Sequence, residues 1–292
     1  MTTSSLDLAN SQELILIHLA ELVADVRSAA SELEFLLVGA SARDLLLFHA
    51  YGIRTGRATE DVDLALAVAD WDEFEKVRTL LLATDHFAPI PGANHKVHHR
   101  RRIEVDFIPF GGVELPDRTI AWPPDGDWVM GVLGFREALS SSTVVPLPLG
   151  QRIDVVSLPM LLVLKVLAWA DRKARARGKD APDLILILQK YLDAGQAERL
   201  YGETELLEST GKFDYESAGA WLAGRDARTM LRQFSTDPDH IEQTILSILT
   251  PQIDPDGPLD LIGELTFMDL ERALLLLNAF LAGFTGGSYP AR

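Results

Sequence analysis

Two aspartates separated by one residue, Asp61 and Asp63, are the residues of this sequence best suited to catalysis. They begin the run DVDLALAV, in which charged or small residues alternate with larger apolar ones, a pattern that predicts a half-buried strand. Side chains two residues apart on a strand point to the same face, so both carboxylates share one side. Because two nearby carboxylates repel each other unless a cation neutralises them, the pair suits Mg²⁺, which takes oxygen ligands and the phosphate oxygens of a substrate.

A third aspartate, Asp106, lies in the apolar run IEVDFIPF, where Val105 and Phe107 face one way and Glu104 and Asp106 the other. If this strand lies beside DVDLALAV, Asp106 joins the first two aspartates. Three carboxylates can hold two metal ions about 4 Å apart, one activating an attacking hydroxyl and the other stabilising a leaving pyrophosphate. The alternative is that D-x-D is only the solvent face of a strand, which is the commoner explanation for an isolated D-x-D.

A turn of small residues comes about twenty positions before the aspartate pair. Gly39, Ala40 and Ser41 follow the predicted strand LEFLLVG and precede a predicted helix that ends at Gly52. Free backbone N–H groups at a helix N-terminus attract anions, so a phosphate could bind there, with Ser41 adding a hydroxyl and Arg43 a guanidinium. The alternative is an ordinary helix with Ser41 as its cap.

Three segments, VGASARDLLL, TEDVDLAL and IEVDFIPF, together resemble the nucleotidyltransferase superfamily related to DNA polymerase beta, over residues 33–110. The segment SLPMLLVLKVLAWADRKARARGKDAPDLILIL resembles the part of the AbiEii/AbiGii-type toxin nucleotidyltransferases in which a helical lysine precedes a basic stretch and K-D-x-x-D. The segments occur in the order of that family, so the resemblance extends to about residue 190.

The resemblance implies that the protein uses Mg²⁺ to transfer a nucleotide from an NTP to an acceptor. In some members of the family the acceptor is the 3′ end of tRNA and the enzyme is the toxin of a toxin–antitoxin or abortive-infection system, so tRNA and an antitoxin protein are expected partners. By position, Asp61, Asp63 and Asp106 would be the catalytic and metal-binding residues, with Asp106 assisting the acceptor hydroxyl. The implied nucleotide-binding residues are Gly39, Ser41, Arg43, Lys165, Asp180 and Asp183, with one of the last two aspartates positioning Lys165 on the triphosphate.

One departure from the superfamily pattern keeps other functions open. In the superfamily, the glycine of this turn is usually followed by Gly or Ser. Here Ala40 follows Gly39, and the serine comes one place later. The run G-A-x-A-R-D-x-L-L is similar to that of CCA-adding enzymes and poly(A) polymerases. The alternatives are therefore a tRNA end-repair enzyme, a nucleotidyltransferase acting on a small molecule such as an aminoglycoside, and a catalytically silent binding protein of the same fold.

Two basic segments have both a functional and a structural interpretation. Residues 95–102 (HKVHHRRR) form a predicted hairpin before Asp106, which either holds an RNA backbone or triphosphate or is simply solvated. A strand sends the side chains of His95, His98 and His99 to both faces, which disfavours a zinc site formed by them. Lys165 lies in an apolar helix, where an unpaired ammonium is costly to bury, so it either reaches solvent or meets phosphate. Residues 172–179 after it bind phosphate or form an exposed helix end.

The remaining sequence predicts an α/β nucleotidyltransferase domain with a mixed sheet at residues 1–156 and an all-α domain at 157–292. Helices are expected at 11–30, after Ser41, after an Asp70 cap with Glu73 in capping-box position, and almost throughout beyond 158. The net charge of −16 argues against binding nucleic acid through the overall field. With no cysteine, no signal peptide and no apolar run long enough for a membrane span, we expect a soluble cytoplasmic protein without membrane contact.

Overall fold

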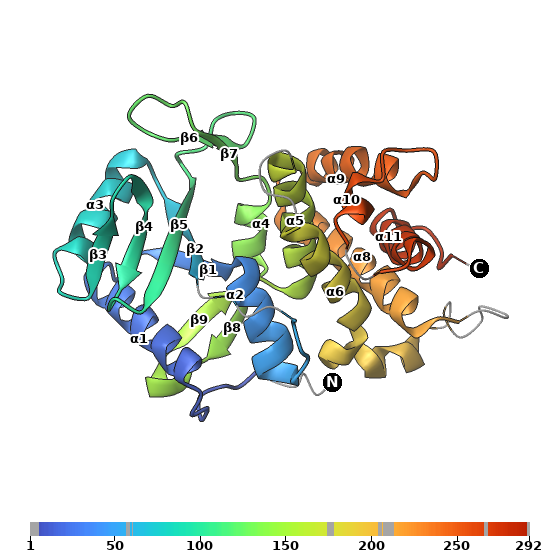
Figure 1. The fold of residues 1–292 in the computed structure, drawn as a ribbon, viewed down its shortest axis with the longest axis horizontal. Coiled ribbons are helices and arrows are strands. Elements are labelled where there is room, and N and C mark those ends of the chain that lie inside the picture. Colours follow the sequence, from blue (N-terminus) through green and yellow to red (C-terminus); the bar gives the residue numbers. More distant parts are fainter. Residues whose placement is uncertain are drawn as a thin grey trace. The chain divides into compact units, whose positions relative to one another are not determined.

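A computed structural model of the chain describes residues 6–56, 59, 61–173, 178–203, 206, 213–265 and 268–290. The chain divides into two compact units, Met1–Ser157 and Leu158–Arg292 (Figure 1). Among the described residues, no helix is both long and apolar enough to cross a membrane.

The first unit is built on a seven-stranded mixed sheet with the strand order β3-β4-β5-β2-β1-β9-β8. Strand β2 pairs in parallel with β5 and antiparallel with β1, and β1 pairs in parallel with β9. This agrees with the predicted α/β class and mixed sheet. The strands of the sheet are β1 (Glu34–Val38), β2 (Asp61–Val68), β3 (Phe87–Ile90), β4 (Ala93–His99), β5 (Ile103–Gly111), β8 (Thr143–Pro146) and β9 (Arg152–Val155).

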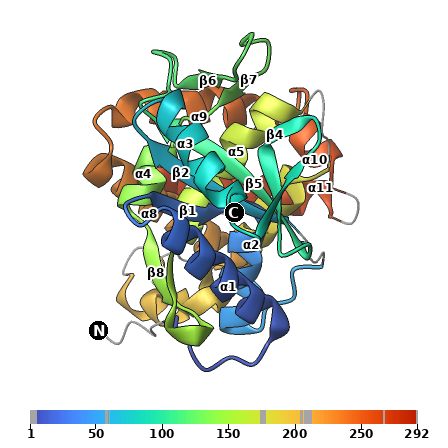
Figure 2. The same cartoon turned by 90° about the vertical axis from the view of Figure 1, so that its left-hand side faces the viewer.

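Helices of the first unit pack against this sheet. Helix α1 contacts β9, α3 contacts β2 and β3, and the two helices contact each other (Figure 2). A separate hairpin, formed by β6 (Thr119–Ala121) and β7 (Val129–Gly131), stands at the top of Figure 1. The helices are α1 (Leu14–Ala29), α2 (Gly39–Asp44), the π-helical turn η1 (Leu45–His49), α3 (Trp71–Leu82), α4 (Phe135–Ser140) and the 3-10 turn η2 (Pro148–Gly150).

Local sequence patterns account for the elements on either side of β2. Along β2 the residues from Val62 to Leu66 that face the core are buried, whereas Asp61 and Asp63 are only half-buried. The carboxylate of Asp70 then accepts a hydrogen bond from the N–H of Glu73, so the predicted cap of α3 is confirmed. The predicted cap at Ser41 is wrong. Helix α2 begins at Gly39, because glycine adopts the positive φ of +68° with which the chain leaves β1.

The second unit is helical in its described part. Helix α8 packs closely on α11, and two glycines allow their backbones to approach: a Cβ on Gly224 would lie 2.1 Å from the carbonyl oxygen of Phe280, and one on Gly283 would lie 2.0 Å from that of Trp221. The elements are α5 (Leu158–Arg172), α6 (Asp180–Lys190), η3 (Leu192–Gln196), η4 (Ala197–Gly202), α8 (Tyr215–Phe234), α9 (Pro238–Ile253), α10 (Asp260–Gly263) and α11 (Leu270–Phe284).

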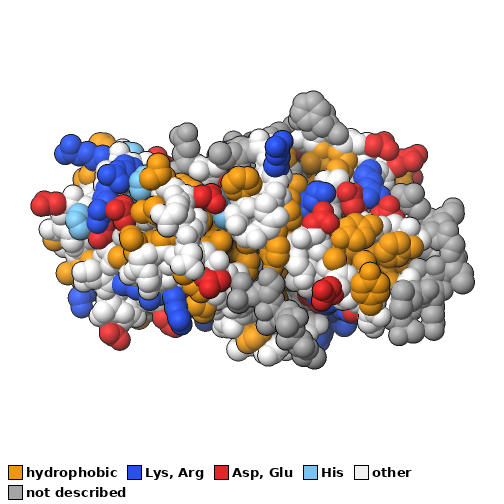
Figure 3. All heavy atoms as spheres, turned by 90° about the horizontal axis from the view of Figure 1, so that it is seen from below, with side chains coloured by type: hydrophobic (Ala, Val, Ile, Leu, Met, Phe, Trp, Pro, Cys, Tyr) orange, Lys and Arg blue, Asp and Glu red, His pale blue; other side chains and the backbone are white. Residues whose placement is uncertain are grey.

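Acidic and basic side chains are interspersed on the face drawn in Figure 3, in small groups between hydrophobic side chains. The face shows no continuous field of one charge, although the net charge of the chain is −16.

Candidate active site

The two strands that carry the aspartates are neighbours in the sheet. In the parallel register of β2 and β5, Asp63 lies opposite Asp106 and Asp61 lies opposite Glu104. All four side chains are half-buried, whereas Val62 and Val105 between them are buried. Four acidic side chains therefore project from the same face of two adjacent strands, the arrangement on which the sequence argument for Asp106 depended.

The turn at Gly39 lies against Asp63. Val38, the last residue of β1, is paired with Asp63 across the antiparallel β1–β2 ladder, and the chain turns immediately afterwards. A Cβ at position 39 would lie only 1.9 Å from Oδ2 of Asp63. Glycine is required here by both the positive φ and this close approach, so the start of α2 sits directly beside the carboxylate.

Asp106 has cationic neighbours on the hairpin formed by β4 and β5. Lys96, which is paired with Asp106 across these strands, places Nζ 3.3 Å from Oδ2 of Asp106 and 2.6 Å from Oε1 of Glu104. Burial raises the pKa of Asp106, although the positive charge of Lys96 opposes this rise. Burial by itself would lower the pKa of Lys96, but the hydrogen bond to Glu104 and the charge of Asp106 raise it overall. Lys96 thus stays positively charged beside two carboxylates.

The donor chemistry of this face fits a hard divalent cation. Asp61 and Asp63 supply carboxylate oxygens on one strand face, and oxygen ligands of this kind suit Mg²⁺. The glycine turn packs directly against the carboxylate of Asp63. In the described part of the chain no three acidic or histidine side chains converge as a ready-made metal cluster, and the carboxylate of Asp106 contacts Lys96. The face therefore offers a pair of ligands at Asp61 and Asp63, with Asp106 available if it turns from Lys96.

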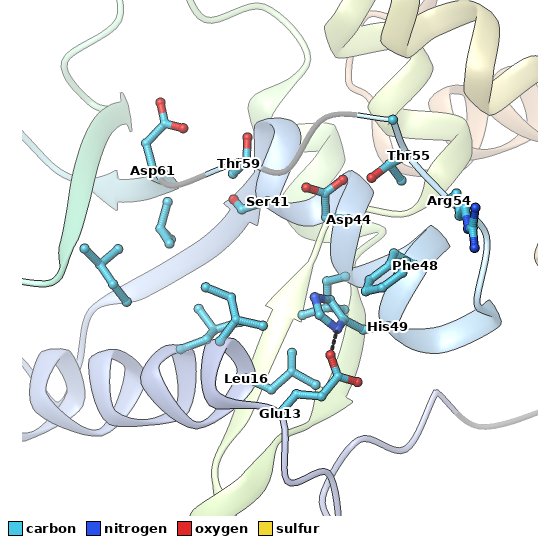
Figure 4. Close-up of a pocket in the computed structure, with 16 residues that line it drawn as sticks. Glu13, Leu16, Ser41, Asp44, Phe48, His49, Arg54, Thr55, Thr59 and Asp61 are labelled. Carbon is cyan, nitrogen blue, oxygen red and sulfur yellow. Dashed lines mark hydrogen bonds and ion pairs between the residues drawn. The ribbon is translucent and has the colours of Figure 1, made fainter.

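A cavity of about 620 Å³ opens beside Asp61. Ser41, Asp44 and Asp61 lie along one side of it, and apolar residues of α1, including Leu16, lie on the other (Figure 4). At its base, Nδ1 of His49 is 2.7 Å from Oε2 of Glu13. The π-helical turn η1 contributes His49 and Phe48 to the lining, and such turns are frequent at functional sites.

Two predicted nucleotide-binding residues of α2 differ in accessibility. The hydroxyl of Ser41 donates to the carbonyl oxygen of Val38 at 3.2 Å, and the side chain borders the cavity. Arg43 is only 2% exposed, and its guanidinium donates to Oδ1 of Asp44 at 2.6 and 2.8 Å. In this structure, therefore, Ser41 is presented to the cavity and Arg43 is held inside the unit.

The predicted lysine of the second unit lies in a buried network of charges. Nζ of Lys165 is 2.6 Å from Oδ2 of Asp183 and 3.1 Å from Oδ1 of Asp180. Arg172 also donates to Asp180, at 2.9 and 3.0 Å. Since a buried charge is tolerated only when it is paired and hydrogen-bonded, both aspartates compensate the ammonium. The structure brings these three sequence-selected residues together, and the side chain of Lys165 does not snorkel freely to solvent.

The histidines of the β4–β5 hairpin separate, as expected for a strand. His95 lies near Asp106, with Nε2 3.9 Å from Oδ1, whereas His98 is exposed and His99 is buried against Asp25. In the basic stretch of the second unit, Lys173 lies over the ring of Trp169, and the predicted phosphate-binding or helix-end residues Arg175 and Arg177 lie outside the described residues.

Sequence reasoning missed the contact between Lys96 and the carboxylates. The signal was present, because a hairpin that folds back about Arg101 puts Lys96 opposite Asp106. It also missed a group of aromatic rings beside His95, formed by Trp71, Trp122 and Trp128. Trp122 and Trp128 lie in a region for which no strand pattern was recognised.

A mixed sheet that presents a D-x-D pair beside a glycine turn is the arrangement of a nucleotidyltransferase. The family model described as "Nucleotidyl transferase AbiEii toxin, Type IV TA system" matches residues 22–268, which is most of the chain. The protein therefore belongs to the AbiEii nucleotidyltransferase toxin family and is an enzyme. No curated protein matches the chain in sequence. Membership of a type IV toxin–antitoxin family implies an NTP substrate and an accompanying antitoxin, and nucleotidyltransferases generally use divalent metal ions.

Proposed function

We propose that the protein transfers a nucleoside monophosphate from an NTP to RNA, with tRNA as the acceptor and Mg²⁺ as the metal, in the cytoplasm. The observation that carries this proposal is the register of β2 and β5, which sets Asp63 opposite Asp106 while Asp63 also contacts the glycine turn. Carboxylates on one face of β2 and β5, next to a glycine turn, support metal-assisted nucleotidyl transfer.

Each site residue has a proposed part in this reaction. Asp61 and Asp63 hold Mg²⁺, and Asp106 completes the carboxylate set and assists the acceptor hydroxyl. The bound metal would neutralise charge on the triphosphate and on the attacking oxygen. Gly39 and Ser41 accommodate phosphate at the start of α2. The acceptor hydroxyl gives its proton to Asp106 as its oxygen forms a bond to the α-phosphorus, the bond from that phosphorus to the oxygen that bridges to the β-phosphate breaks, and pyrophosphate leaves.

Lys165, Asp180 and Asp183 belong to the proposed nucleotide-binding set. Their mutual hydrogen bonds support a positioned ammonium, because two aspartates fix Nζ from two sides. Arg43 also belongs to the proposed nucleotide-binding residues, but with a different role. Because it is buried and bonds to Asp44, we propose that it orders α2 and does not contact phosphate.

An RNA acceptor is supported by the hairpin that carries Asp106. Its turn exposes Arg101 and Arg102. Basic side chains of this kind neutralise backbone phosphates. A small-molecule acceptor is the second candidate, because the cavity beside Asp61 has the volume of a typical small-molecule site.

The acceptor is tested by incubating the purified protein with Mg²⁺ and each α-labelled NTP, in the presence of total tRNA or of an aminoglycoside mixture. The proposal predicts label on tRNA with the wild type and none with Asp61→Ala. Label on the aminoglycosides alone would establish the second candidate. Absence of label on any acceptor, together with absence of pyrophosphate release, would contradict both.

A growth experiment tests the role as a toxin separately. Expression of the wild type from an inducible promoter should arrest growth, and co-expression of the neighbouring antitoxin gene should relieve the arrest. Asp61→Ala, produced at the same level, should not arrest growth. Arrest by Asp61→Ala would show that toxicity does not come from nucleotidyl transfer.

A further inference from the structure

Four aromatic side chains of the first unit form a group of contacting rings, called here the aromatic stack after its stacked pair Trp122 and Trp128, that no part of the proposed reaction yet uses. The rings of Trp122 and Trp128 are nearly parallel, at an interplanar angle of 14°, with centroids 5.1 Å apart. His95 lies against both, with ring centroids 5.3 Å from Trp122 and 4.5 Å from Trp128, and Trp71 lies 5.3 Å from Trp122 on the side of α3.

One end of this stack reaches the candidate active site and the other reaches solvent. His95 places Nε2 3.9 Å from Oδ1 of Asp106. Trp122, in the middle, is only 6% exposed, whereas Trp128 is 40% exposed and the next residue, Val129, is also exposed. An exposed indole, Trp128, therefore lies next to His95, the residue near Asp106.

The exposed indole is held in place by the backbone of the hairpin. The N–H of Trp122 donates to the carbonyl oxygen of Trp128 at 2.9 Å, and the N–H of Gly126 donates to the carbonyl oxygen of Trp122 at 2.9 Å. These backbone bonds close the segment between β6 and β7 and fix the positions from which both rings project, and the rings themselves stack on each other. A preorganised ring loses less conformational entropy on binding than a mobile one.

The middle ring of the group also carries an unsatisfied polar atom. The indole Nε1 of Trp122 is buried and has no hydrogen-bond acceptor among the described residues. Buried donors of this kind are normally satisfied, so an acceptor atom is expected from outside this part of the chain. Because Nε1 of Trp122 is buried, a ligand reaches the group at the exposed ring of Trp128, where a nucleobase offers a π-face for stacking.

We propose that Trp128, supported by Trp122 and His95, stacks an unpaired nucleobase at the terminus of the acceptor RNA. This inference rests on the proposed function. Strand order assigns the base to the acceptor rather than to the NTP. The stack lies on the β4–β5 side with Asp106, whereas the phosphate turn at Gly39 lies on the β1–β2 side. A flexible single-stranded end reaches such a platform, but a base-paired stem does not.

The proposed base-stacking platform, formed by Trp128 with Trp122 and His95, is tested by direct binding, which needs no catalysis. The probe is a fluorescently labelled single-stranded hexaribonucleotide, and its anisotropy is titrated with protein. The proposal predicts that Trp128→Ala weakens binding roughly tenfold or more, as expected for loss of one base–aromatic stack. Trp128→Phe, which retains a ring, should recover most of the affinity. Tyr201→Ala removes another exposed aromatic residue, 83% exposed in the second unit, and should leave the affinity unchanged.

A second probe identifies the stacked base. This probe is the same hexaribonucleotide with an abasic 3′-terminal sugar. The wild type should bind the abasic probe as weakly as Trp128→Ala binds the intact probe. Trp128→Ala should bind the abasic probe no more weakly than the wild type does. Each NTP is titrated in parallel by competition, and its affinity should not change in Trp128→Ala. Unchanged affinity for RNA in Trp128→Ala would overturn the proposal, and so would weakened binding of NTP alone.

These experiments distinguish failure of the base-stacking proposal from failure of the proposed nucleotidyl transfer to RNA. If the protein transfers no nucleotide to RNA but binds the hexaribonucleotide through Trp128, the proposed acceptor reaction fails and the platform remains. If transfer to tRNA occurs with an unchanged KM in Trp128→Ala, the reaction remains and the platform is contradicted. Thermal unfolding of each variant should match the wild type, because an exposed ring contributes little to the core.

Discussion

Asp63 on β2 and Asp106 on β5 occupy paired positions of two parallel strands. Asp63 is at the same time the residue that the Gly39 turn contacts, since a Cβ at position 39 would overlap its carboxylate. The side chain of Asp63 thus links the two halves of the proposed site: the turn at Gly39, where phosphate is proposed to bind, and Asp106, which is proposed to assist the acceptor hydroxyl. Substitutions that disturb this relationship should affect transfer far more than folding.

Gly39→Ala should abolish nucleotidyl transfer, because the added methyl group occupies the position of Oδ2 of Asp63, only 1.9 Å away. Gly52→Ala is a matched control. Both glycines have a φ of +68°, but a Cβ at position 52 meets no atom within 4 Å. Both variants should lose about 1–2 kcal/mol of unfolding free energy from the left-handed backbone. Only Gly39→Ala should lose activity in the labelled-NTP assay, and equal activity in the two variants would refute the contact argument.

Lys165→Met should strongly destabilise the second unit. It leaves Asp180 and Asp183 buried without the ammonium that compensates them, and breaking such a network costs about 3–5 kcal/mol. Urea unfolding measures the loss. Lys165→Arg retains the charge but changes the geometry, so it should recover most of the stability.

The same pair of variants separates a structural lysine from one that contacts nucleotide. If Lys165 binds the triphosphate, Lys165→Arg should remain folded but show a raised KM for NTP. A wild-type KM in a folded Lys165→Arg protein would limit this lysine to a structural role.

The free energy of unfolding should fall as the pH drops below about 6.5, the ordinary pKa of histidine. Burial lowers the pKa of His99, although its hydrogen bond to Asp25 opposes the change. The unfolded chain therefore binds a proton at a higher pH than the folded chain does. This contribution to stability is present above the unfolded pKa and is lost as the pH falls. The charged groups around the ring are Asp25 and Glu21 on α1, with Arg100 and His86 nearby.

Asp25 reinforces this dependence at lower pH. Burial raises its pKa, but hydrogen bonds from Arg100 and His99 outweigh burial and lower the pKa overall. Urea titrations at pH 7.5 and 5.5 should show a smaller pH effect for His99→Gln than for the wild type. His98→Gln, on the exposed side of the same strand, should retain the wild-type difference. An identical pH effect in His99→Gln and the wild type would exclude His99 as its source.

Features set by neighbouring residues were predictable from the sequence. The alternation in DVDLALAV defines β2 as Asp61–Val68, and the Asp70 cap depends on a bond to an N–H only three residues away. The start of α2 was misplaced at Ser41 because a serine is a common cap, whereas the positive φ of Gly39 is set by the approach of the chain to Asp63.

Long-range pairing explains what the sequence did not predict. The sequence placed Asp106 with Asp61 and Asp63 only on the condition that their strands are neighbours. Those strands are separated by α3 and a hairpin, so no local pattern specifies the register of Asp63 with Asp106. The aromatic stack is similar. Trp122 and His95 come from different elements, and their contact depends on the path of β6 and β7, whose short strands have little periodicity.

Removal of single charges from the two strands tests the central claim most directly. Transfer of label from an α-labelled NTP should be measured with saturating Mg²⁺ for the wild type, Asp61→Asn, Asp63→Asn and Asp72→Asn, an exposed control at the start of α3. A metal ligand is worth several kcal/mol to the transition state, so the first two variants should lose on the order of 10³-fold in rate while unfolding at the wild-type urea concentration. Asp72→Asn should keep full activity. A folded Asp63→Asn enzyme with the wild-type rate would contradict the assignment of this face as the active site.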